Sequence, residues 1–400
     1  MKYIVVLGDG MADEPLASLD NKTPLMVANT PQMDMLAKWS EMGLVHTIPE
    51  GMKPGSDTAN LAVLGYNPRI YYSGRSPLEA LSIGVDMEDG DIAIRCNLVT
   101  LTEEDKPYNE LTILDHSAGE ISTLDAAQLI DAVRKELEND EFKFYVGTSY
   151  RHLTIWKSGR VEELAQPHDH LGKVIGDYLP AVPPLRRMME RSYEILNNHP
   201  INIDRKNRGL NKANSIWFWG AGTKPKLTPF EDKYQLKGAM ISAVDLLKGI
   251  AVGAGMKVIK VPGADGTLHT NYEGKAEAAV KVLCEDDYDF VYIHVEAPDE
   301  MGHQGNVEAK IKAIEYLDQR VIRPVMEGMS KAGKSYRMLV MPDHPTPISC
   351  RTHTSDPVPY LLYDSRFKQN NNWNYNEIEA KSSPIEIFDG YTLIEKLFSK

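Results

Sequence analysis

FVYIHVEAPDEMGH, residues 290–303, is the stretch that decides the fold. Its first six residues form a short, almost wholly apolar run that is rich in β-branched and aromatic side chains. This composition is typical of a strand buried on both faces of a parallel sheet. Turn-forming and acidic residues follow at once, and Asp299 and His303 lie four residues apart among them. A buried strand that ends in polar side chains predicts a site beyond the carboxyl edge of an α/β sheet.

Two other stretches repeat this design. YIVVLG, residues 3–8, is followed by Asp9, and MLVM, residues 338–341, is followed by Pro342, Asp343 and His344. VIKV, residues 258–261, is a fourth candidate strand. Because Asp9, Asp299 and Asp343 each follow a strand, we expect all three at the same edge of one sheet.

Helical patterns separate these strands. From Val307 to Val325 the apolar residues step by threes and fours, with a bend expected at Pro324 and an end near Gly333. A similar stripe begins at Met240 and ends before Gly253. Strand–helix alternation predicts an α/β fold with a doubly wound, mostly parallel sheet.

The middle of the chain has a different character. Residues 92–101 and 142–157 read as strands with mixed faces, and prolines and arginines cluster near residues 180–187. A chain of 400 residues suggests two domains. We therefore expect a catalytic domain from residues 1–69 and 214–400, interrupted by a smaller inserted α+β domain at residues 70–213.

Composition limits the partners. A formal net charge of −13 argues against nucleic acid as the main partner, but it leaves room for a small phosphorylated substrate in a local basic pocket. No apolar stretch is long enough to cross a membrane or to resemble a signal peptide. The cysteines, Cys96, Cys284 and Cys350, are scattered, which favours a reducing cytoplasmic setting. The sequence leaves the oligomeric state open.

Carboxylates and imidazoles make up the strongest candidate site. Mixed Asp and His ligands suit manganese or zinc, whereas carboxylates alone suit magnesium or calcium. A single Asp after a strand can also be a helix N-cap, but three strand ends that each deliver such groups favour a metal site. The candidates, which could hold two divalent ions, are Asp9, Ser56, Asp299, His303, Asp343, His344 and His353.

Ser56 allows two interpretations. Gly55-Ser56-Asp57-Thr58 precedes an apolar stretch that looks like the start of a helix, so Ser56 could be a simple N-cap. The same position could place it among free backbone N–H groups, which favour a bound phosphate. A neighbouring metal ion would then lower the pKa of the hydroxyl and make it a nucleophile. The residues alone leave both interpretations open.

Five motifs together resemble one family. MKYIVVLGDGMAD, KPGSDTANLAVLGYNP, VEAPDEMGHQGN, MPDHPTP and RTHTSDPVP resemble the archaeal-type cofactor-independent phosphoglycerate mutases, metalloenzymes of the alkaline phosphatase superfamily. The resemblance spans nearly the whole chain, with the motifs in the expected order. It implies an alkaline phosphatase-like core that interconverts 3-phosphoglycerate and 2-phosphoglycerate through a phosphoserine. It also implies two metal ions and no added 2,3-bisphosphoglycerate.

The resemblance assigns roles to the candidate ligands. Asp9, Ser56, Asp343 and His344 look like the ligands of one ion. Asp299, His303 and His353 look like those of the other. Ser56 looks like the residue that is phosphorylated, and manganese is the first choice of metal before zinc, cobalt or magnesium.

Substrate contacts are implied by segment only. Asp115 and His116 resemble a substrate loop but could be a polar turn, and Arg151 with His152 could be an exposed strand end. The spaced pair His168 and His170 favours a surface loop. The full set of candidates is Arg95, Asp115, His116, Arg151 and His152, with Lys233 or Lys237 before a helix expected at residues 238–247.

Three classes of function remain open at this point. The first is the mutase. The second is another enzyme that would use the same metal site: a homoserine kinase, which is proposed for some bacterial relatives, a phosphopentomutase or a phosphatase. The third is a metal-binding protein without catalysis.

Overall fold

Two compact units make up the computed structural model, which describes residues 1–399. Unit 1 joins Met1–Tyr72 to the chain from Lys226 onward, and unit 2 is Ser73–Pro225. Unit 2 runs past the expected boundary at residue 213, because strand β7 (Ser215–Thr223) pairs with β3 (Ile92–Leu101) along most of its length.

A mixed sheet forms the centre of unit 1. In the described chain its eight strands run in the order β13-β2-β12-β11-β1-β10-β8-β9. Neighbours among β11, β1, β10, β8 and β9 are parallel, and β12 is antiparallel to both of its neighbours. The expected α/β class with a mostly parallel sheet is confirmed. The strands are β1 Lys2–Gly8, β2 Glu41–Val45, β8 Gly238–Ile241, β9 Lys257–Val258, β10 Phe290–Val295, β11 Tyr336–Met341, β12 Val358–Asp364 and β13 Glu386–Ile387.

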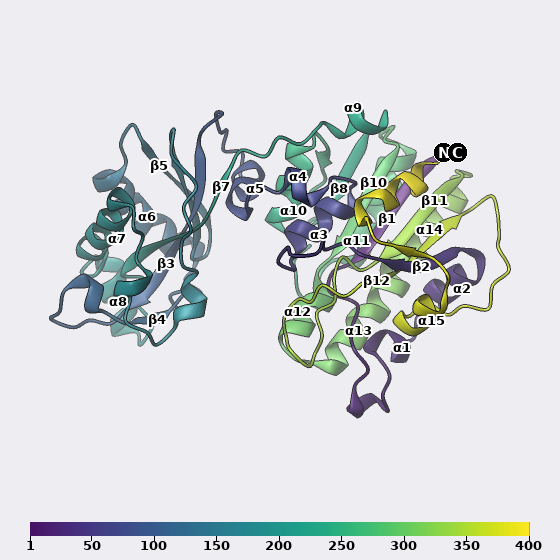
Figure 1. Ribbon diagram of the computed structural model, residues 1–400, viewed down its shortest axis with the longest axis horizontal. Coiled ribbons are helices and arrows are strands. Elements are labelled where there is room, and N and C mark those ends of the chain that lie inside the picture. Colours follow the sequence, from purple (N-terminus) through teal and green to yellow (C-terminus); the bar gives the residue numbers. More distant parts are fainter. Residues whose placement is uncertain (400) are drawn as a thin grey trace. The chain divides into compact units, whose positions relative to one another are not determined.

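The register of the central strands brings their carboxyl ends level. Gly8 pairs with Val295, and Leu7 pairs with both His294 and Met341. In Figure 1 the purple β1 lies between the green strands β10 and β11. The residues that follow these three strands therefore start from the same edge of the sheet.

Helices cover the sheet of unit 1. On one face, side chains such as Ile4, Val6 and Ile293 pack with helices α2, α11, α13 and α14 in one apolar core. No helix within residues 1–399 is both long and apolar enough to span a bilayer. The helices are α1 Pro24–Val27, α2 Pro31–Trp39, α3 Ser56–Val63, α4 Pro68–Tyr71, α9 Phe230–Tyr234, α10 Asp245–Gly253, α11 Tyr272–Cys284, α12 Ala297–His303, α13 Val307–Leu317, α14 Arg323–Lys331, α15 Glu377–Ser382 and α16 Leu393–Phe398.

The expected helix at residues 238–247 is wrong. Gly238–Ile241 forms strand β8 beside β10, and the helix begins only at Asp245. A four-residue apolar run does not distinguish a strand from a helix by its period, and here pairing with β10 decides the outcome. Likewise, the expected strand at residues 258–261 is reduced to Lys257–Val258.

The helical stretch from Val307 is interrupted by a change of winding. A π-helical segment, Asp318–Ile322, separates α13 from α14. Pro324 follows in the first turn of α14. The missing N–H of proline costs little stability there, because a new series of backbone hydrogen bonds begins with α14. The expected bend near Pro324 thus coincides with a break in the regular α-helical pattern.

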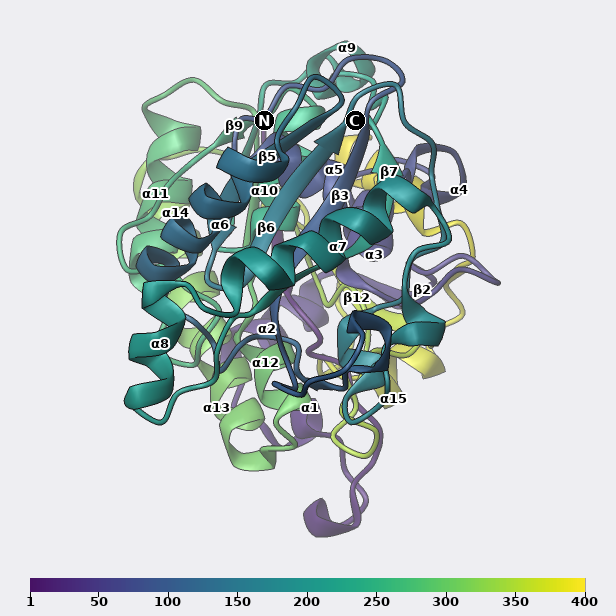
Figure 2. The same cartoon turned by 90° about the vertical axis from the view of Figure 1, so that its left-hand side faces the viewer.

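Unit 2 is an α+β unit built around β3. This strand pairs antiparallel with β4, β6 and β7, and all ten of its residues are buried. Figure 2 shows α6 and α7 in front of the sheet, and both pack on it. The other elements are β4 Ile113–Asp115, β5 Phe142–Thr148, β6 Arg151–Trp156, α5 Arg75–Ser82, α6 Thr123–Leu137, α7 Pro183–Leu196 and α8 Pro200–Asn207.

Candidate metal centre

The loops after β1 and β11 meet the start of α12 at the carboxyl edge of the sheet. The backbone N–H of Gly10 donates to Asp343 Oδ1 over 3.1 Å. Gly10 has a φ of +57°, and a Cβ there would strike Thr346 and Asp299. Only glycine allows this backbone conformation with such close neighbours, so Gly10 lets the three strand ends converge.

Four of the predicted ligands surround one point. His344 Nε2 lies 3.1 Å from Ser56 Oγ, 3.4 Å from Asp9 Oδ1 and 3.4 Å from Asp343 Oδ2. We call Asp9, Ser56, Asp343 and His344 the inner set. The carboxylate and imidazole members of this set are almost wholly buried.

Ser56 is the first residue of α3, and Gly55 takes the N-cap position. The interpretation of Ser56 as a mere N-cap is therefore wrong. Asn60, one turn later, donates from Nδ2 to Ser56 O and to Asp343 Oδ2, each over 2.8 Å, and accepts from the hydroxyl of Tyr292. This buried amide ties the start of α3 to the strand ends, and it explains why Ser56 lies beside His344.

The other three predicted ligands form a second group. Asp299 Oδ2 lies 3.3 Å from His303 Nε2, and Asp299 Oδ1 lies 3.4 Å from His353 Nε2. The two imidazoles face each other with their Nε2 atoms 2.9 Å apart. His303 Nδ1 donates to the carbonyl of Arg351, which turns Nε2 toward Asp299. We call Asp299, His303 and His353 the outer set.

Burial and mutual charge shift the pKa values of these groups. Burial, followed by the charge of Asp343, raises the pKa of Asp9 well above its usual range. Burial also acts to raise the pKa of Asp299, but hydrogen bonds from His303 and His353 outweigh it and hold that pKa well below its usual range. The hydrogen bond to Asp299 raises the pKa of His303 to about 9. The protonation state of each of these carboxylates and imidazoles therefore depends on the charges and hydrogen bonds of its neighbours.

These residues fit a divalent cation. Asp9 Oδ1 is buried and has no hydrogen-bond partner among residues 1–399, which is costly unless a cation takes that place. Donor atoms bound to one ion at about 2.1 Å lie about 3.0 to 3.5 Å apart. The separations in both sets, 2.9 to 3.4 Å, match that spacing. The donors are the mixed Asp and His type that suits manganese or zinc.

His294 on β10 is a site residue that none of the sequence motifs indicated. Donor positions alone group it with Asp9 and Asp343, and group His344 with Asp299 and His353, each within 4.8 Å. However, His294 Nε2 donates to Asp9 Oδ2 over 3.0 Å, and its Nδ1 accepts from Ser242. Burial lowers the pKa of His294 to about 3, so the ring is neutral. Both nitrogens are occupied, and His294 therefore supports Asp9 and is no free ligand.

Unit 2 holds a separate basic and aromatic cluster. The guanidinium of Arg95 lies 4.6 Å above the ring of Trp219, and Glu79 pairs with Arg95 and with Arg75. Arg151 lies over Tyr150, whose ring also meets His116 edge-on. His168, from the expected surface loop, contacts His116 and Trp219. The predicted residues Arg95, His116 and Arg151 thus share neighbours, and Arg75 and His168 join them.

Asp115 and His152, two other predicted substrate contacts in unit 2, differ in how many of their hydrogen-bonding positions are already occupied. Asp115 already accepts bonds from the Ser117 and Gly119 backbones, the Ser117 hydroxyl and Asn211, which suits a structural turn. His152 is buried and accepts from Gly147 at Nδ1, and its Nε2 has no partner within the described chain. His116 Nδ1 is buried and unpartnered in the same way. His116 and His152 therefore have hydrogen-bonding capacity left, and Asp115 has little.

The structure places neither predicted lysine at the metal centre. Lys237 directly precedes β8, so it lies at the amino edge of the parallel strands, opposite the ligands. Lys233 lies near the rings of Tyr66 and Tyr234, and the Tyr234 hydroxyl donates to carbonyls just beyond the end of α3. Ser56 is at the other end of that helix. Both lysines were expected before a helix at residues 238–247, but that segment begins as strand β8.

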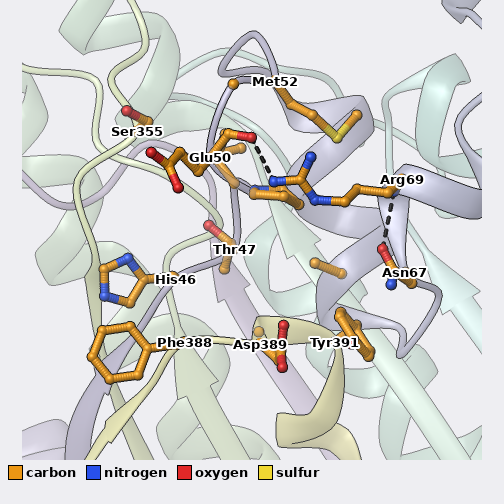
Figure 3. A pocket seen from close by; sticks show the side chains of 15 residues that line it. His46, Thr47, Glu50, Met52, Asn67, Arg69, Ser355, Phe388, Asp389 and Tyr391 are labelled. Atoms are coloured by element: carbon orange, nitrogen blue, oxygen red, sulfur yellow. Dashed lines mark hydrogen bonds between the residues drawn. The ribbon is translucent and has the colours of Figure 1, made fainter.

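A hollow of about 670 Å³ lies beside the inner set on unit 1. Figure 3 shows His46 and Phe388 on one side of it and Arg69 with Glu50 on another. Thr47 lines the hollow, and its hydroxyl donates to the carbonyl of Asp343. The hollow therefore borders the metal centre through the Thr47 hydroxyl and the Asp343 carbonyl, and no member of either set lines it.

Comparisons with known proteins give one consistent family. A family model for 2,3-bisphosphoglycerate-independent phosphoglycerate mutase matches residues 37–202. The enzymes of that name from Methanosarcina barkeri and Methanothrix thermoacetophila are 50% and 44% identical, covering 91% and 100% of this chain and 90% and 100% of their own. Among solved structures, a protein from Pyrococcus horikoshii is 28% identical with a TM-score of 0.81, covering 100% of this chain and 98% of its own. The cofactor-independent phosphoglycerate mutase from Thermoplasma acidophilum is 26% identical with a TM-score of 0.65, covering 99% of each chain.

Proposed function

Since the chain belongs to the family of 2,3-bisphosphoglycerate-independent phosphoglycerate mutases, we propose that it interconverts 3-phosphoglycerate and 2-phosphoglycerate through a phosphorylated Ser56. The observation that carries the serine's role is the position of its hydroxyl. Ser56 Oγ lies 3.1 Å from His344 Nε2, on the first residue of a helix and beside two buried carboxylates. No added 2,3-bisphosphoglycerate is needed in this scheme, because Ser56 carries the phosphoryl group between the two positions.

The inner and outer sets are proposed to hold one divalent cation each. Asp9, Ser56, Asp343 and His344 would hold the first, and Asp299, His303 and His353 the second. When bound, such cations would lower the pKa of the serine hydroxyl and withdraw charge from the phosphoryl oxygens. Manganese is the first choice because both sets mix carboxylates with imidazoles, and zinc, cobalt and magnesium are the alternatives to test.

The chain's own residues then carry the transfer. Ser56 Oγ gives up its proton and forms a bond to phosphorus as the bond to the 3-oxygen of the substrate breaks, and the 3-oxygen takes up a proton to leave glycerate. The phosphoryl group next passes from Ser56 to the 2-hydroxyl of the retained glycerate, which regenerates the free serine. Ser56 lies at the N-terminus of α3, and the positive end of the helix dipole favours the negative charge of a phosphoserine there.

Unit 2 is proposed to bind the glycerate moiety through its basic and aromatic cluster. Arg95 and Arg151 offer forked guanidinium donors, which suit a carboxylate. His116 and His152 each keep a buried ring nitrogen with no protein partner in the described residues. These nitrogens would donate to or accept from the substrate's hydroxyl and carboxylate oxygens.

The three free cysteines are consistent with an enzyme of the reducing cytoplasm.

The test is a mutase assay on protein stripped of metal and reloaded with manganese. We expect 3-phosphoglycerate to be converted to 2-phosphoglycerate without bisphosphoglycerate, and we expect EDTA to abolish the conversion. Homoserine with ATP, pentose phosphates and simple phosphate esters are tested in parallel. Net hydrolysis of phosphoglycerate, or turnover of homoserine alone, would replace the proposed reaction with one of those alternatives.

Ser56→Ala tests the covalent step. It should abolish turnover while retaining the fold and the metal bound by the outer set. In the wild type, mass spectrometry of acid-quenched enzyme with substrate should find one phosphoryl group on the peptide that contains Ser56. Full activity of the alanine variant would exclude the phosphoserine route.

A further inference from the structure

Thr346 connects the inner set to the outer set. It lies in the loop after β11, and its side chain is fully buried. Its hydroxyl donates to Asp299 Oδ1 and lies 3.3 Å from His344 Nδ1. Because a hydroxyl has one hydrogen, donation to Asp299 leaves Thr346 Oγ1 to accept from His344 Nδ1–H. A single side chain thus contacts one predicted ligand of each set.

This hydrogen bond and the carbonyl of Pro345, which lies 3.3 Å from the same Nδ1, together fix the tautomer of His344. With the hydrogen on Nδ1, the lone pair of the neutral ring lies on Nε2. Nε2 is the atom that faces Ser56 Oγ and Asp9 Oδ1. The Thr346 hydroxyl, together with the Pro345 carbonyl, therefore directs the ligand atom of His344 toward the inner set, and the same hydroxyl holds Asp299 for the outer set.

The side chain of Thr346 has little freedom. A Cβ at Gly10 would collide with Thr346 Oγ1, and a Cβ at Gly302 would collide with the carbonyl and the methyl group of Thr346. Two glycines thus make room for it, and their close approach keeps the hydroxyl where it is.

A buried ion pair holds the backbone of this loop. Lys310 on α13 is fully buried, and its ammonium donates to Asp13 Oδ2 over 2.7 Å, to Thr346 O over 2.8 Å and to Ala12 O over 3.3 Å. Asp13 in turn accepts from the backbone N–H of Ile348. All three ammonium hydrogens are used, and they join the loop after β1 to the loop after β11.

We propose that Thr346 is a positioning residue that orients Asp299 and His344 for metal binding, and that Lys310 with Asp13 holds it in place. The inference rests on the proposed assignment of Asp299 and His344 as ligands. Hydrogen-bond partners of metal ligands typically change metal affinity by about 10- to 100-fold when removed. Thr346 touches ligands of both sets, so its loss weakens both sites together.

The experiment compares Thr346→Val with Thr346→Ser. Valine keeps the shape and removes the hydroxyl, whereas serine keeps the hydroxyl and removes the methyl group. Manganese affinity of the metal-free full-length protein is measured by isothermal titration calorimetry, with circular dichroism to check the fold. We expect Thr346→Val to weaken binding at both sites by about 10- to 100-fold and Thr346→Ser to retain the wild-type affinity.

Lys310→Met has a matched control in unit 2. Lys212 is also buried, pairs with Glu103 and donates to the carbonyl of Asn197 over 2.8 Å. Both variants remove a buried ammonium that joins a carboxylate to a backbone carbonyl. We expect Lys310→Met to lower manganese affinity and Lys212→Met to leave it unchanged. Should Lys310→Met fail to fold, the two Thr346 variants decide the question.

The outcomes separate this inference from the proposed function. Equal manganese affinity of Thr346→Val and the wild type overturns the positioning role, provided that Asp299→Asn weakens binding. Equal loss in the valine and serine variants also overturns it, because packing and not the hydroxyl would then be responsible. If Asp299→Asn itself leaves metal binding unchanged, the ligand assignment in the proposed function fails.

Discussion

The inner and outer sets differ in how far solvent reaches them. The side chains of Asp343 and His344 have 0% of their surface exposed and Asp9 has 3%, whereas His303 has 36% and His353 has 22%. The inner set is also fixed by more buried bonds, through His294, Asn60 and the Gly10 backbone. From this difference we infer that the buried ligands of the inner set hold Ser56 rigidly, whereas the outer set stays open to metal exchange and to substrate.

The largest expected effect comes from removing a carboxylate of the inner set. Asp9→Asn should lower kcat by about 10³-fold or more, because Asp9 Oδ1 is a buried oxygen that has no hydrogen-bond partner in the described chain. His353→Gln in the outer set should cost about 10²-fold. Steady-state mutase rates, with product removed by enolase, check both values. Equal losses would mean that the two sets do not differ in the way their burial suggests.

His294→Phe should give the next largest effect. The ring size is nearly kept, but the donor to Asp9 Oδ2 is lost, so metal affinity at the inner set should fall by about 10- to 100-fold. Binding at the outer set should change little, since His294 does not contact it. Calorimetric titration of the metal-free protein with manganese resolves the two sites. A uniform loss at both sites would show that the sets act as one unit.

A chelator should show that the outer set and the inner set release their metal ions at different rates. The outer set should release its ion first, because its imidazoles are partly exposed and the inner ligands are buried. Metal release into a coloured chelator should then follow two phases, and His303→Gln should speed or remove the fast phase only. A single phase in the wild type would contradict the division between an enclosed and an open set.

Tyr292→Phe should have the smallest effect. It removes the hydroxyl that donates to Asn60 Oδ1 and leaves that buried oxygen without its donor. We expect the free energy of unfolding to fall by about 1 to 3 kcal/mol and kcat to fall by less than about tenfold. Urea unfolding of the manganese-free protein measures the first and the mutase assay the second. A large loss of kcat at unchanged stability would place Tyr292 in the chemistry itself.

The strand-end ligands could be predicted because two local signals coincide there. Buried parallel strands are short and apolar, so Val295 and Met341 mark their ends closely, and Asp299 and Asp343 follow within a few residues. Register is not visible in sequence, yet parallel strands of one sheet share a carboxyl edge, and this rule sufficed to bring Asp9 to the same place.

The supporting residues could not be predicted in the same way. Asn60, Thr346 and Lys310 act through partners more than 30 residues away, and no local pattern distinguishes them from ordinary buried residues. His294 carried one usable signal, an imidazole inside an otherwise apolar strand, where a buried polar group requires a partner.

The errors also have local causes. Lys233 and Lys237 were placed by a helix that proved to be β8, because a short apolar run fits either structure. The boundary of unit 2 was set before SIWFWGAG, which packs as β7 against β3 through long-range pairing.

The central position of β1 has a consequence for synthesis of the chain. Its two neighbours in the sheet, β10 and β11, begin at Phe290 and Tyr336. The first strand to be synthesised therefore cannot pair until most of the chain has been made. At translation rates of about 5 to 20 residues per second this interval is roughly 15 to 60 s, during which an apolar strand remains unpaired. Unit 2 is continuous in sequence and can fold as it leaves the ribosome. The metal centre is therefore completed late in synthesis, because a nascent chain that stalls before residue 353 lacks at least one of the predicted ligands.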